Sequence, residues 1–523
     1  MTARLRLLYP FVFAVLPLLN VLSRNPGGSN LWDMSLMIAA MLAVCAVFYG
    51  LVMLLGRGRF QKPVVSLIVF LMIFWFYGYS PLAHSVQAGA SGAAGWAIVA
   101  AAAALTAGAA WWLARRPASL ARVTTFLALT CTLAAGWMLS RTALHGIRTR
   151  GATAQSALVR RLSQPVSEPS ARAPQDTSLQ RDIYLIVLDE YANSPVLRER
   201  FGFDNRAFED SLVQLGFTLP RVMRSNYVHT LLSLPSLLNF SYLTPLTQEI
   251  GPHETDPTLP NYLVENNRTA AFLKERGYEF RFFPSQWWIS TRHNRNADSE
   301  FQAWHGVDPL RDATGSDLRR WLVRVTALPS DYSHDADHVK RTFEGLQEVP
   351  SIAGPTFAFA HVLNPHRPIV FNAGNCPALR RPRSGVTAPV KRDGYIRQVE
   401  CLNDLLLGLV TSLVQRSSPA PIILLVGDHG TNSLRYSSAR SAETVSPAQA
   451  RERFGAFGAF YLPEGGGRIL AASVTLVNVI PEVLNHYYGA KIPLSPDSLY
   501  MSLEQTPYLF APVDPASLSR AAE

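Results

Sequence analysis

The chain has 523 residues, of which 48% are hydrophobic and 16% are charged. This length exceeds what one hydrophobic core usually organises, so at least two domains are expected. The net charge of +10 would suit a nucleic-acid-binding protein, but the arginines are scattered and some flank apolar segments, where membrane topology explains them better. We therefore expect no nucleic acid as a partner.

Charged residues are sparse before about residue 140, where several apolar segments approach the length needed to cross a bilayer, about 20 residues. The five segments are about 7–23, 31–55, 63–82, 91–113 and 119–140. The first is short and contains two prolines, so a signal peptide is an alternative, but no small-x-small cleavage site follows it. The sequence thus predicts a membrane domain over residues 1–145, with about five transmembrane helices and the lipid bilayer as a partner.

Along the chain, short loops that are rich in basic residues alternate with loops that are poor in them. Two arginines precede the first span, GRGRFQK lies between the second and third, and Arg115 and Arg116 follow the fourth. Loops rich in Lys and Arg stay in the cytoplasm. This predicts a multi-pass inner (cell) membrane protein with a cytoplasmic N-terminus and a periplasmic, or otherwise extracytoplasmic, C-terminal part. Arg141, Arg148 and Arg150 lie on the predicted outer side and argue against this orientation. The spans contain almost no ionisable residues, which favours an anchor over a transport path.

Residues 146–181 are rich in Ser, Ala, Pro, Gln and Arg, a composition typical of a linker without a core of its own. Of the four cysteines, Cys45 and Cys131 lie in apolar segments and are expected to be inert small hydrophobic side chains. Cys376 and Cys401 follow the linker without zinc-like spacing. An oxidising compartment would favour a disulfide between them, with two free thiols as the alternative.

Two apolar stretches after the linker each end in side chains that bind metals. DIYLIVLDEY reaches Asp189 and Glu190, and PIILLVGDHG reaches Asp428 and His429. Both stretches indicate buried parallel strands, and ligands bind beyond the carboxyl ends of such strands. Carboxylate and imidazole groups are common metal ligands. We therefore favour a metal site over the alternative, in which these side chains only cap turns.

Between the two strands, SNYVHTLLSLPS places Thr230 before an apolar run with helical spacing. The N-terminus of a helix attracts phosphate or sulfate. A threonine is a poor nucleophile unless a metal or a base lowers its pKa, and capping the helix is the ordinary alternative. The neighbouring ligand motifs make a nucleophile the better interpretation.

A third apolar stretch, FAFAHVLNPHRPIVF, leads to His361, His366 and Arg367. Imidazole and guanidinium groups can bind a substrate anion, and an imidazole can protonate a leaving oxygen. A purely structural role for each is the alternative.

In this order the motifs resemble those of the alkaline phosphatase superfamily, specifically its membrane-anchored sulfatase-like branch. That branch includes lipoteichoic acid synthases and lipid A phosphoethanolamine transferases. The resemblance covers about residues 181–505. It implies an α/β catalytic domain at 182–510, with a central, mostly parallel sheet flanked by helices, and a tail at 511–523.

The resemblance also implies a chemistry. One divalent metal ion, Mn²⁺, Zn²⁺ or Mg²⁺, would be bound by Asp189, Thr230, Asp428 and His429. Thr230 would form a covalent phospho-threonine, and His366 would contact the transferred group or the leaving oxygen. His361 is a weaker candidate for that contact.

Some positions depart from the family pattern. Sulfatases mature a Cys or Ser within C/S-x-P-x-R, and the matching segment here has neither the Cys nor the Arg. Glu190 stands where many relatives have Gly, which leaves its role open, and no partner set for a second zinc is found. The sequence predicts a phosphoryl-group transferase or hydrolase of the phosphodiester, phosphoglycerol or phosphoethanolamine type, acting on a phospholipid or envelope glycan. A sulfuric ester hydrolase and a non-catalytic envelope-binding or structural membrane protein are the alternatives.

Overall fold

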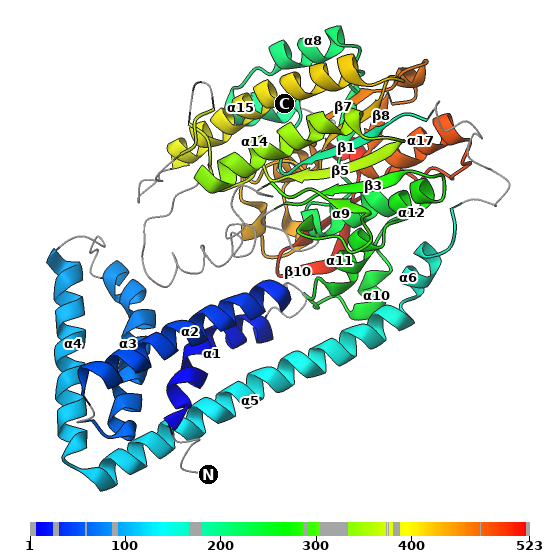
Figure 1. Ribbon diagram of the computed structural model, residues 1–523. Helices are drawn as coiled ribbons and strands as arrows, with labels where there is room; N and C mark the ends of the chain where they lie inside the picture. The colour runs from blue at the N-terminus through cyan, green and yellow to red at the C-terminus, as the bar shows by residue number, and fades with distance from the viewer. Residues whose placement is uncertain are drawn as a thin grey trace. The chain divides into compact units, whose positions relative to one another are not determined.

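A computed structural model describes the chain at residues 7–24, 31–57, 60–85, 93–166, 180–285, 291–303, 333–372, 374, 376–379, 388–470 and 472–518. It divides into two compact units (Figure 1), the first ending at Arg150 and the second beginning at Gly151. We call them the membrane unit and the catalytic unit and describe each by itself.

The membrane unit is helical. Its helices are α1 (Tyr9–Arg24), α2 (Leu31–Leu55), α3 (Lys62–Ser85), α4 (Ala93–Ala114) and α5 (Pro117–Gln155), the last of which continues into the catalytic unit. By length and composition, α2 to α5 are long and apolar enough to cross a membrane, whereas α1 is a shorter apolar helix of 16 residues. At a rise of about 1.5 Å per residue, α1 extends about 24 Å, less than the hydrocarbon core of about 30 Å. Helices therefore occupy all five expected segments, and four of them reach spanning length.

The segment after the last span differs from the expected linker. Helix α5 continues to Gln155, and α6 (Ala157–Leu162) follows with Ser156 as its N-cap. Leu158, Val159 and Leu162 of α6 are buried in a hydrophobic cluster of the catalytic unit. These three apolar residues lie on one face of a short helix, a pattern that the polar average over 146–181 conceals. The linker is therefore shorter at its N-terminal end than the sequence predicted.

The catalytic unit is built on a six-stranded sheet with the strand order β4-β3-β5-β1-β6-β7. The strands are β1 (Ile183–Leu188), β3 (Glu279–Phe283), β4 (Ser299–Glu300), β5 (Thr356–Val362), β6 (Ile422–Gly427) and β7 (Gly458–Tyr461). All neighbours pair in parallel except β6 and β7. Every residue of β1, β5 and β6 is buried, as expected for parallel strands covered on both faces. The predicted α/β class with a mostly parallel sheet is confirmed.

Helices cover both faces of this sheet. In Figure 1, α8 (Arg206–Gln214), α14 (Ser333–Glu348) and α15 (Ala388–Arg416) lie along one face, and α9 (Thr230–Asn239) and α12 (Arg268–Lys274) along the other. Alternate residues of β1 point to opposite faces of the sheet and pack in two different hydrophobic cores. Tyr184, Ile186 and Leu188 pack with the α15 side, whereas Ile183, Leu185 and Val187 pack with the α9 side, where α17 (Leu476–Tyr488) also lies. The sheet thus lies between two layers of helices.

Shorter elements complete the catalytic unit. They are α7 (Ser194–Val196), η3 (Leu197–Phe201), β2 (Val222–Arg224), α10 (Leu246–Ile250), α11 (Thr258–Glu265), η5 (Val349–Ser351), η6 (Tyr436–Ser438), η7 (Ala442–Thr444), α16 (Pro447–Phe454), η8 (Gly466–Arg468), β8 (Ser473–Thr475), β9 (Leu499–Leu503), β10 (Thr506–Val513) and η9 (Pro515–Leu518). Strand β2 pairs with β8, and β9 pairs with β10. Ala511 and Leu518 are buried with β9 residues, so the packed structure continues past residue 510, where the sequence placed the start of the tail.

Candidate active site

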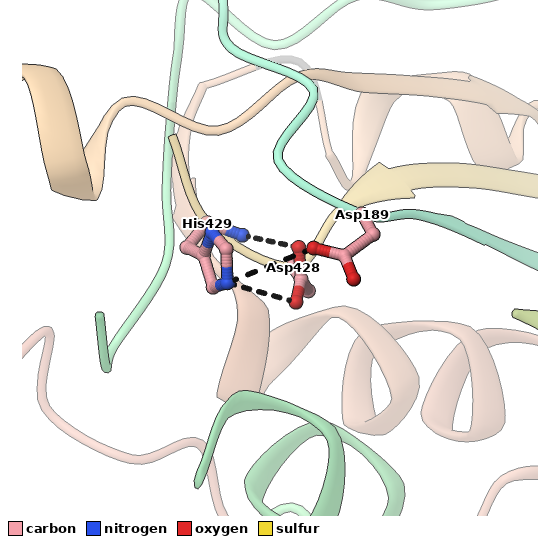
Figure 2. A group of neighbouring side chains, drawn as sticks. All are labelled: Asp189, Asp428 and His429. Carbon is pink, nitrogen blue, oxygen red and sulfur yellow. Dashed lines mark hydrogen bonds and ion pairs between the residues drawn. The ribbon is translucent and has the colours of Figure 1, made fainter. Parts of the chain in front are cut away.

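Asp189 and Asp428 are neighbours because β1 and β6 pair in parallel. Leu188 lies opposite Gly427, so the next residue on each strand is a carboxylate at the carboxyl edge of the sheet. Both side chains are buried. His429 follows Asp428, and the ligand atoms of these three residues all lie within 4.8 Å of one another (Figure 2).

Each carboxylate has one oxygen free for another ligand. Asp428 Oδ1 accepts hydrogen bonds from the backbone N–H groups of Glu190 (3.0 Å) and His429 (2.9 Å). Asp428 Oδ2 and Asp189 Oδ1 are buried, and neither has a hydrogen-bond partner in the described structure. A buried polar atom without a partner costs about 1–3 kcal/mol, and more when it is charged. Two such oxygens beside one imidazole fit the donor set of a divalent cation.

The tautomer of His429 follows from its surroundings. Nδ1 lies 3.1 Å from the carbonyl oxygen of Gly430, which can only accept, so Nδ1 carries the proton and donates it there. Nε2 is then an acceptor, 3.2 Å from Asp428 Oδ2 and 3.9 Å from Asp189 Oδ1. Burial, with the nearby charge of Arg453, lowers the pKa of His429 well below its usual value. A neutral imidazole therefore faces two carboxylates, an arrangement that a cation between them would stabilise.

The two carboxyl groups themselves resist ionisation when no cation is bound. Burial, followed by the charge of Asp428, raises the pKa of Asp189 well above its usual value. Burial also raises the pKa of Asp428. Both shifts have the sign expected for a carboxyl group taken out of water, and that of Asp189 also has the sign expected beside a like charge.

Thr230 is the first residue of α9, and its hydroxyl meets this cluster. His229 before it is extended, with φ −133° and ψ 138°, and occupies the N-cap position. The Thr230 side chain therefore does not cap the helix, contrary to the alternative interpretation. Its Oγ1 lies 3.1 Å from His429 Nε2. The structure thus brings together all four side chains that the sequence proposed as metal ligands.

His361 lies on β5, opposite Val187 of β1. Its Nδ1 lies 2.9 Å from Thr291 Oγ1, and its Nε2 lies 3.7 Å from Asp189 Oδ2. Burial, followed by the charge of His366, lowers the pKa of His361 to about 3. His361 is therefore a neutral group beside the carboxylate cluster.

His366 lies on the loop after β5 and is the more accessible histidine, with 44% of its side chain exposed. Its Nε2 lies 4.0 Å from Glu190 Oε2, and its backbone N–H donates to the carbonyl of Asp189. Burial lowers its pKa, but the charges of Asp189 and Glu190 outweigh this, so the pKa of His366 is raised. Arg367, the next residue, is exposed on the same loop. His366 is thus the group best able to carry a proton at the mouth of the cluster.

Arg453 of α16 enters the site, although the sequence analysis did not single it out. Its Nη1 donates to Glu190 Oε1 (3.1 Å) and to the carbonyl of Gly430 (2.6 Å), and its Nε donates to the carbonyl of Val228 (2.8 Å). Nη2 lies 3.3 Å from His429 Nε2. Arg453 therefore holds Glu190 and adds a fixed positive charge beside the carboxylates. Its local sequence, RERF, looks like that of any amphipathic helix and gives no signal of this role.

Both glycines of GDHG serve close packing of the backbone. A Cβ on Gly427 would lie 2.3 Å from the carbonyl oxygen of Tyr191, and a Cβ on Gly430 would lie 1.9 Å from that of Glu452. Any larger residue at either position would push these segments apart. The glycines therefore fix the positions of Asp428 and His429 between them.

Helix α15 supports the loop that carries His366. Gln398 is fully buried, and its Oε1 accepts from Asn364 Nδ2 and the Val370 backbone, each at 2.8 Å. Its Nε2 donates to the carbonyls of Pro365 (2.8 Å) and His366 (3.1 Å). One amide thus holds the loop at four points.

A disulfide anchors the same region a little further along the chain. Cys376 and Cys401 are bonded, with their Cα atoms 5.3 Å apart, and Cys401 lies on α15 one turn after Gln398. Cys45 and Cys131 are buried and free. The loop after β5 is therefore attached to one helix by both an amide and a covalent bond.

No protein-family model and no curated protein matches the chain. Several solved structures, in contrast, do match it. Full-length lipooligosaccharide phosphoethanolamine transferase A from Neisseria meningitidis is 11% identical, with a TM-score of 0.39, over 92% of this chain and 94% of that chain. The C-terminal periplasmic domain of EcEptC from Escherichia coli, in complex with Zn, is 11% identical, with a TM-score of 0.44, over 67% of this chain and 96% of that chain.

The phosphonate monoester hydrolase of Agrobacterium radiobacter is 12% identical, with a TM-score of 0.41, over 61% of this chain and 80% of that chain. These neighbours are alkaline phosphatase superfamily enzymes. They belong to the group whose motif order the sequence resembles. Because the identities and TM-scores are low, we base the functional proposal on the geometry of the site.

Proposed function

We propose that the chain is a membrane-anchored, metal-dependent enzyme that transfers or hydrolyses a phosphoryl group, with Thr230 as its nucleophile. One observation carries this proposal. The Thr230 hydroxyl lies 3.1 Å from His429 Nε2, beside two buried carboxylate oxygens that accept no hydrogen bond in the described structure. A hydroxyl used only to cap a helix would have no reason to face such a cluster.

Asp189, Thr230, Asp428 and His429 would hold one divalent ion, for which Mn²⁺, Zn²⁺ and Mg²⁺ are the candidates. When bound, such an ion lowers the pKa of a hydroxyl and neutralises charge on phosphoryl oxygens. Arg453 adds a second, permanent positive charge within 3.3 Å of His429 Nε2. Together these groups favour a substrate whose charge lies on the oxygens of a phosphoryl group.

The reaction would take place in two steps. Thr230 Oγ1, having lost its proton to solvent, forms a bond to phosphorus in line with the bond to the leaving alcohol, which breaks, and it is released again as the alkoxide in the second step. His366, which the charges of Asp189 and Glu190 help to keep protonated, donates a proton to the leaving oxygen. Water, or a hydroxyl of a lipid or glycan, then takes the phosphoryl group from Thr230 while the neutral His366 accepts its proton.

The apolar helices of the membrane unit support a membrane-bound substrate. Tethering raises the effective concentration of an enzyme at a surface, which suits a phospholipid donor or an envelope glycan acceptor. The alternation of basic residues between loops favours a cytoplasmic N-terminus and a catalytic unit outside the cytoplasm, as in an inner-membrane protein with a periplasmic domain.

The test uses the full chain in detergent. After chelation, it is assayed with Mn²⁺, Zn²⁺ or Mg²⁺ against phosphodiester, phosphomonoester and sulfate-ester reporters, together with two variants. Thr230→Ala removes the nucleophile, which costs up to about 10⁶-fold in well-studied enzymes, and we expect at least about a 10³-fold loss. Ser233→Ala, one turn further along α9, removes a buried hydroxyl that bonds to the Tyr227 carbonyl, and should retain activity. Equal activity in Thr230→Ala, or activity on sulfate esters alone, contradicts the proposal.

A further inference from the structure

Two arginines of the catalytic unit meet at the C-terminal end of α9, away from the candidate active site. Arg161, on α6, donates from Nη2 to Ser241 Oγ at 3.0 Å. Arg268, the first residue of α12, has its guanidinium carbon 4.9 Å from the centre of the Phe240 ring. Phe240 and Ser241 are consecutive, so a single turn of the chain brings the two cations together.

Neither arginine has a carboxylate partner among the residues that the structure describes. None of the ion pairs among the described residues includes Arg161 or Arg268. Glu265, three residues before Arg268, is instead paired with Arg295. Burial, followed by the charge of Arg161, lowers the pKa of Arg268, which indicates that the two cations repel each other.

Arg268 also has an unused donor. Its Nε is buried, and within the described structure it has no hydrogen-bond partner. A buried donor without an acceptor costs free energy, so native structures rarely keep one unless a ligand or water completes it. An acceptor bound at Nε would lie beside the Phe240–Ser241 turn, to which Arg161 also donates.

Ordinary structural roles explain only part of this arrangement. The C-terminal end of a helix attracts cations, and the Phe240 ring covers a face of the Arg268 guanidinium. Neither interaction supplies an acceptor for Nε. Neither explains why a second arginine, from a separate helix, lies close to the first.

We propose that Arg161, Arg268 and the Ser241 hydroxyl form a binding site for a phosphate group. The planar fork of an arginine matches the oxygens of phosphate. The Ser241 hydroxyl, which donates to the Tyr242 carbonyl at 3.3 Å in this structure, would turn to donate to the phosphate. The site is separate from Thr230, because the ten residues of α9 place about 15 Å between its ends. The inference therefore does not depend on the proposed catalytic function.

The phosphate can belong to a lipid headgroup or to a soluble phosphate ester. Helix α6 begins two residues after α5, a helix that contains a candidate membrane span, so a lipid headgroup is one source to test. The experiment therefore needs one arm for each source.

The test uses the full chain in nanodiscs. In the first arm, phosphatidylcholine nanodiscs are titrated with inorganic phosphate while the thermal unfolding midpoint is followed. In the second arm, retention of phosphatidylglycerol from mixed nanodiscs is measured by native mass spectrometry. Arg161→Ala removes one cation, and Arg268→Lys keeps the charge but removes the Nε donor. Arg295→Ala is the control, because Arg295 is an exposed arginine that already has Glu265 as its partner.

We expect Arg161→Ala and Arg268→Lys each to weaken binding by about tenfold or more in at least one arm, and Arg295→Ala to leave it unchanged. Phosphate bound near Thr230 contributes equally to all variants. If the two test variants retain less lipid, the natural ligand is a lipid headgroup. If they bind only inorganic phosphate more weakly, the ligand is a soluble phosphate ester. Wild-type binding by both test variants, or an equal loss in Arg295→Ala, overturns the proposal.

Discussion

Replacing Asp428 by asparagine should stabilise the metal-free protein and abolish its response to metal. The amide oxygen of the new side chain can still accept the backbone N–H groups of Glu190 and His429, so the local backbone is retained. The amide nitrogen takes the place of Oδ2, which lies 3.2 Å from His429 Nε2, and donates to it. The variant thus removes one of two crowded negative charges and replaces a metal ligand with a hydrogen-bond donor.

The size of the effect follows from the separation of the charges. The ligand oxygens of the two carboxylates lie within 4.8 Å of each other, and at that distance two unit charges repel by about 3 kcal/mol at an effective dielectric constant of about 20. Arg453 and His366 offset part of this repulsion, as does partial protonation of the pair, so we expect a gain of about 1–2 kcal/mol. With an unfolding entropy of about 2.1 cal/mol/K per residue, that gain raises the unfolding midpoint of a unit of about 350 residues by about 1–3 °C. Metal at about 100 times its Kd would stabilise the wild type by about 2.7 kcal/mol, and the variant should lack this increment.

The assay is thermal unfolding of the full chain in detergent, with EDTA and then with each candidate metal. Glu452→Gln is the matched control, since Glu452 is also a buried carboxylate near the site, but its oxygens accept from Thr431, Ser433 and Leu434. Removing its charge should lower the midpoint in EDTA and preserve the metal response. The reasoning is refuted if Asp428→Asn behaves like this control.

The burial of Asp428 gives the metal-free protein a pH dependence. Burial raises the pKa of Asp428 to about 6, from an ordinary value of about 3.9, so the folded state binds this proton more tightly than the unfolded state. The stability contributed by this group is therefore fully present below about pH 4 and is lost as pH rises through about 6. In EDTA, the wild type should lose stability across this window more steeply than Asp428→Asn. Identical slopes for the two proteins would contradict this explanation.

Two further predictions concern the loop that carries His366. Gln398→Met preserves volume but removes four hydrogen bonds, so kcat should fall about tenfold or more while the metal-induced shift of the unfolding midpoint is unchanged. Loss of that metal shift would mean that Gln398 supports the metal ligands rather than the loop. Reduction of the Cys376–Cys401 disulfide, which joins residues 25 apart, should cost about 3 kcal/mol. An unfolding midpoint that is unchanged by reductant would argue against this contribution.

The sequence could predict the pairing of the two strand ends, because parallel strands bring their carboxyl ends to one edge of a sheet. IYLIVLD and IILLVGD have the same construction, and the register places Asp189 and Asp428 as neighbours. Assigning a role to Thr230 required the neighbouring ligand motifs as well, because a hydroxyl before an apolar helix is common. Its contact with His429 depends on how α9 packs against the sheet, which is a property of tertiary structure.

Other parts of the site carry no local signal. Arg453 lies on an ordinary amphipathic helix, and only the packing of α16 brings it to Glu190. Gln398 is one polar residue in a 29-residue helix, and its role appears only when the loop after β5 folds against it. The expected linker follows from average composition, and the expected tail from the extent of the family resemblance. Neither reveals single buried residues such as Leu158 and Leu518.

The most direct test of the central claim is to identify the residue that becomes covalently modified during turnover. The full chain is incubated with a phosphodiester donor and a divalent metal, quenched in acid, and digested for mass spectrometry. A phosphoryl adduct on Thr230, absent from Thr230→Ala and strongly reduced in Asp428→Asn, is the predicted result. Steady turnover with the adduct on another residue, or undiminished turnover by Thr230→Ala, would contradict the account.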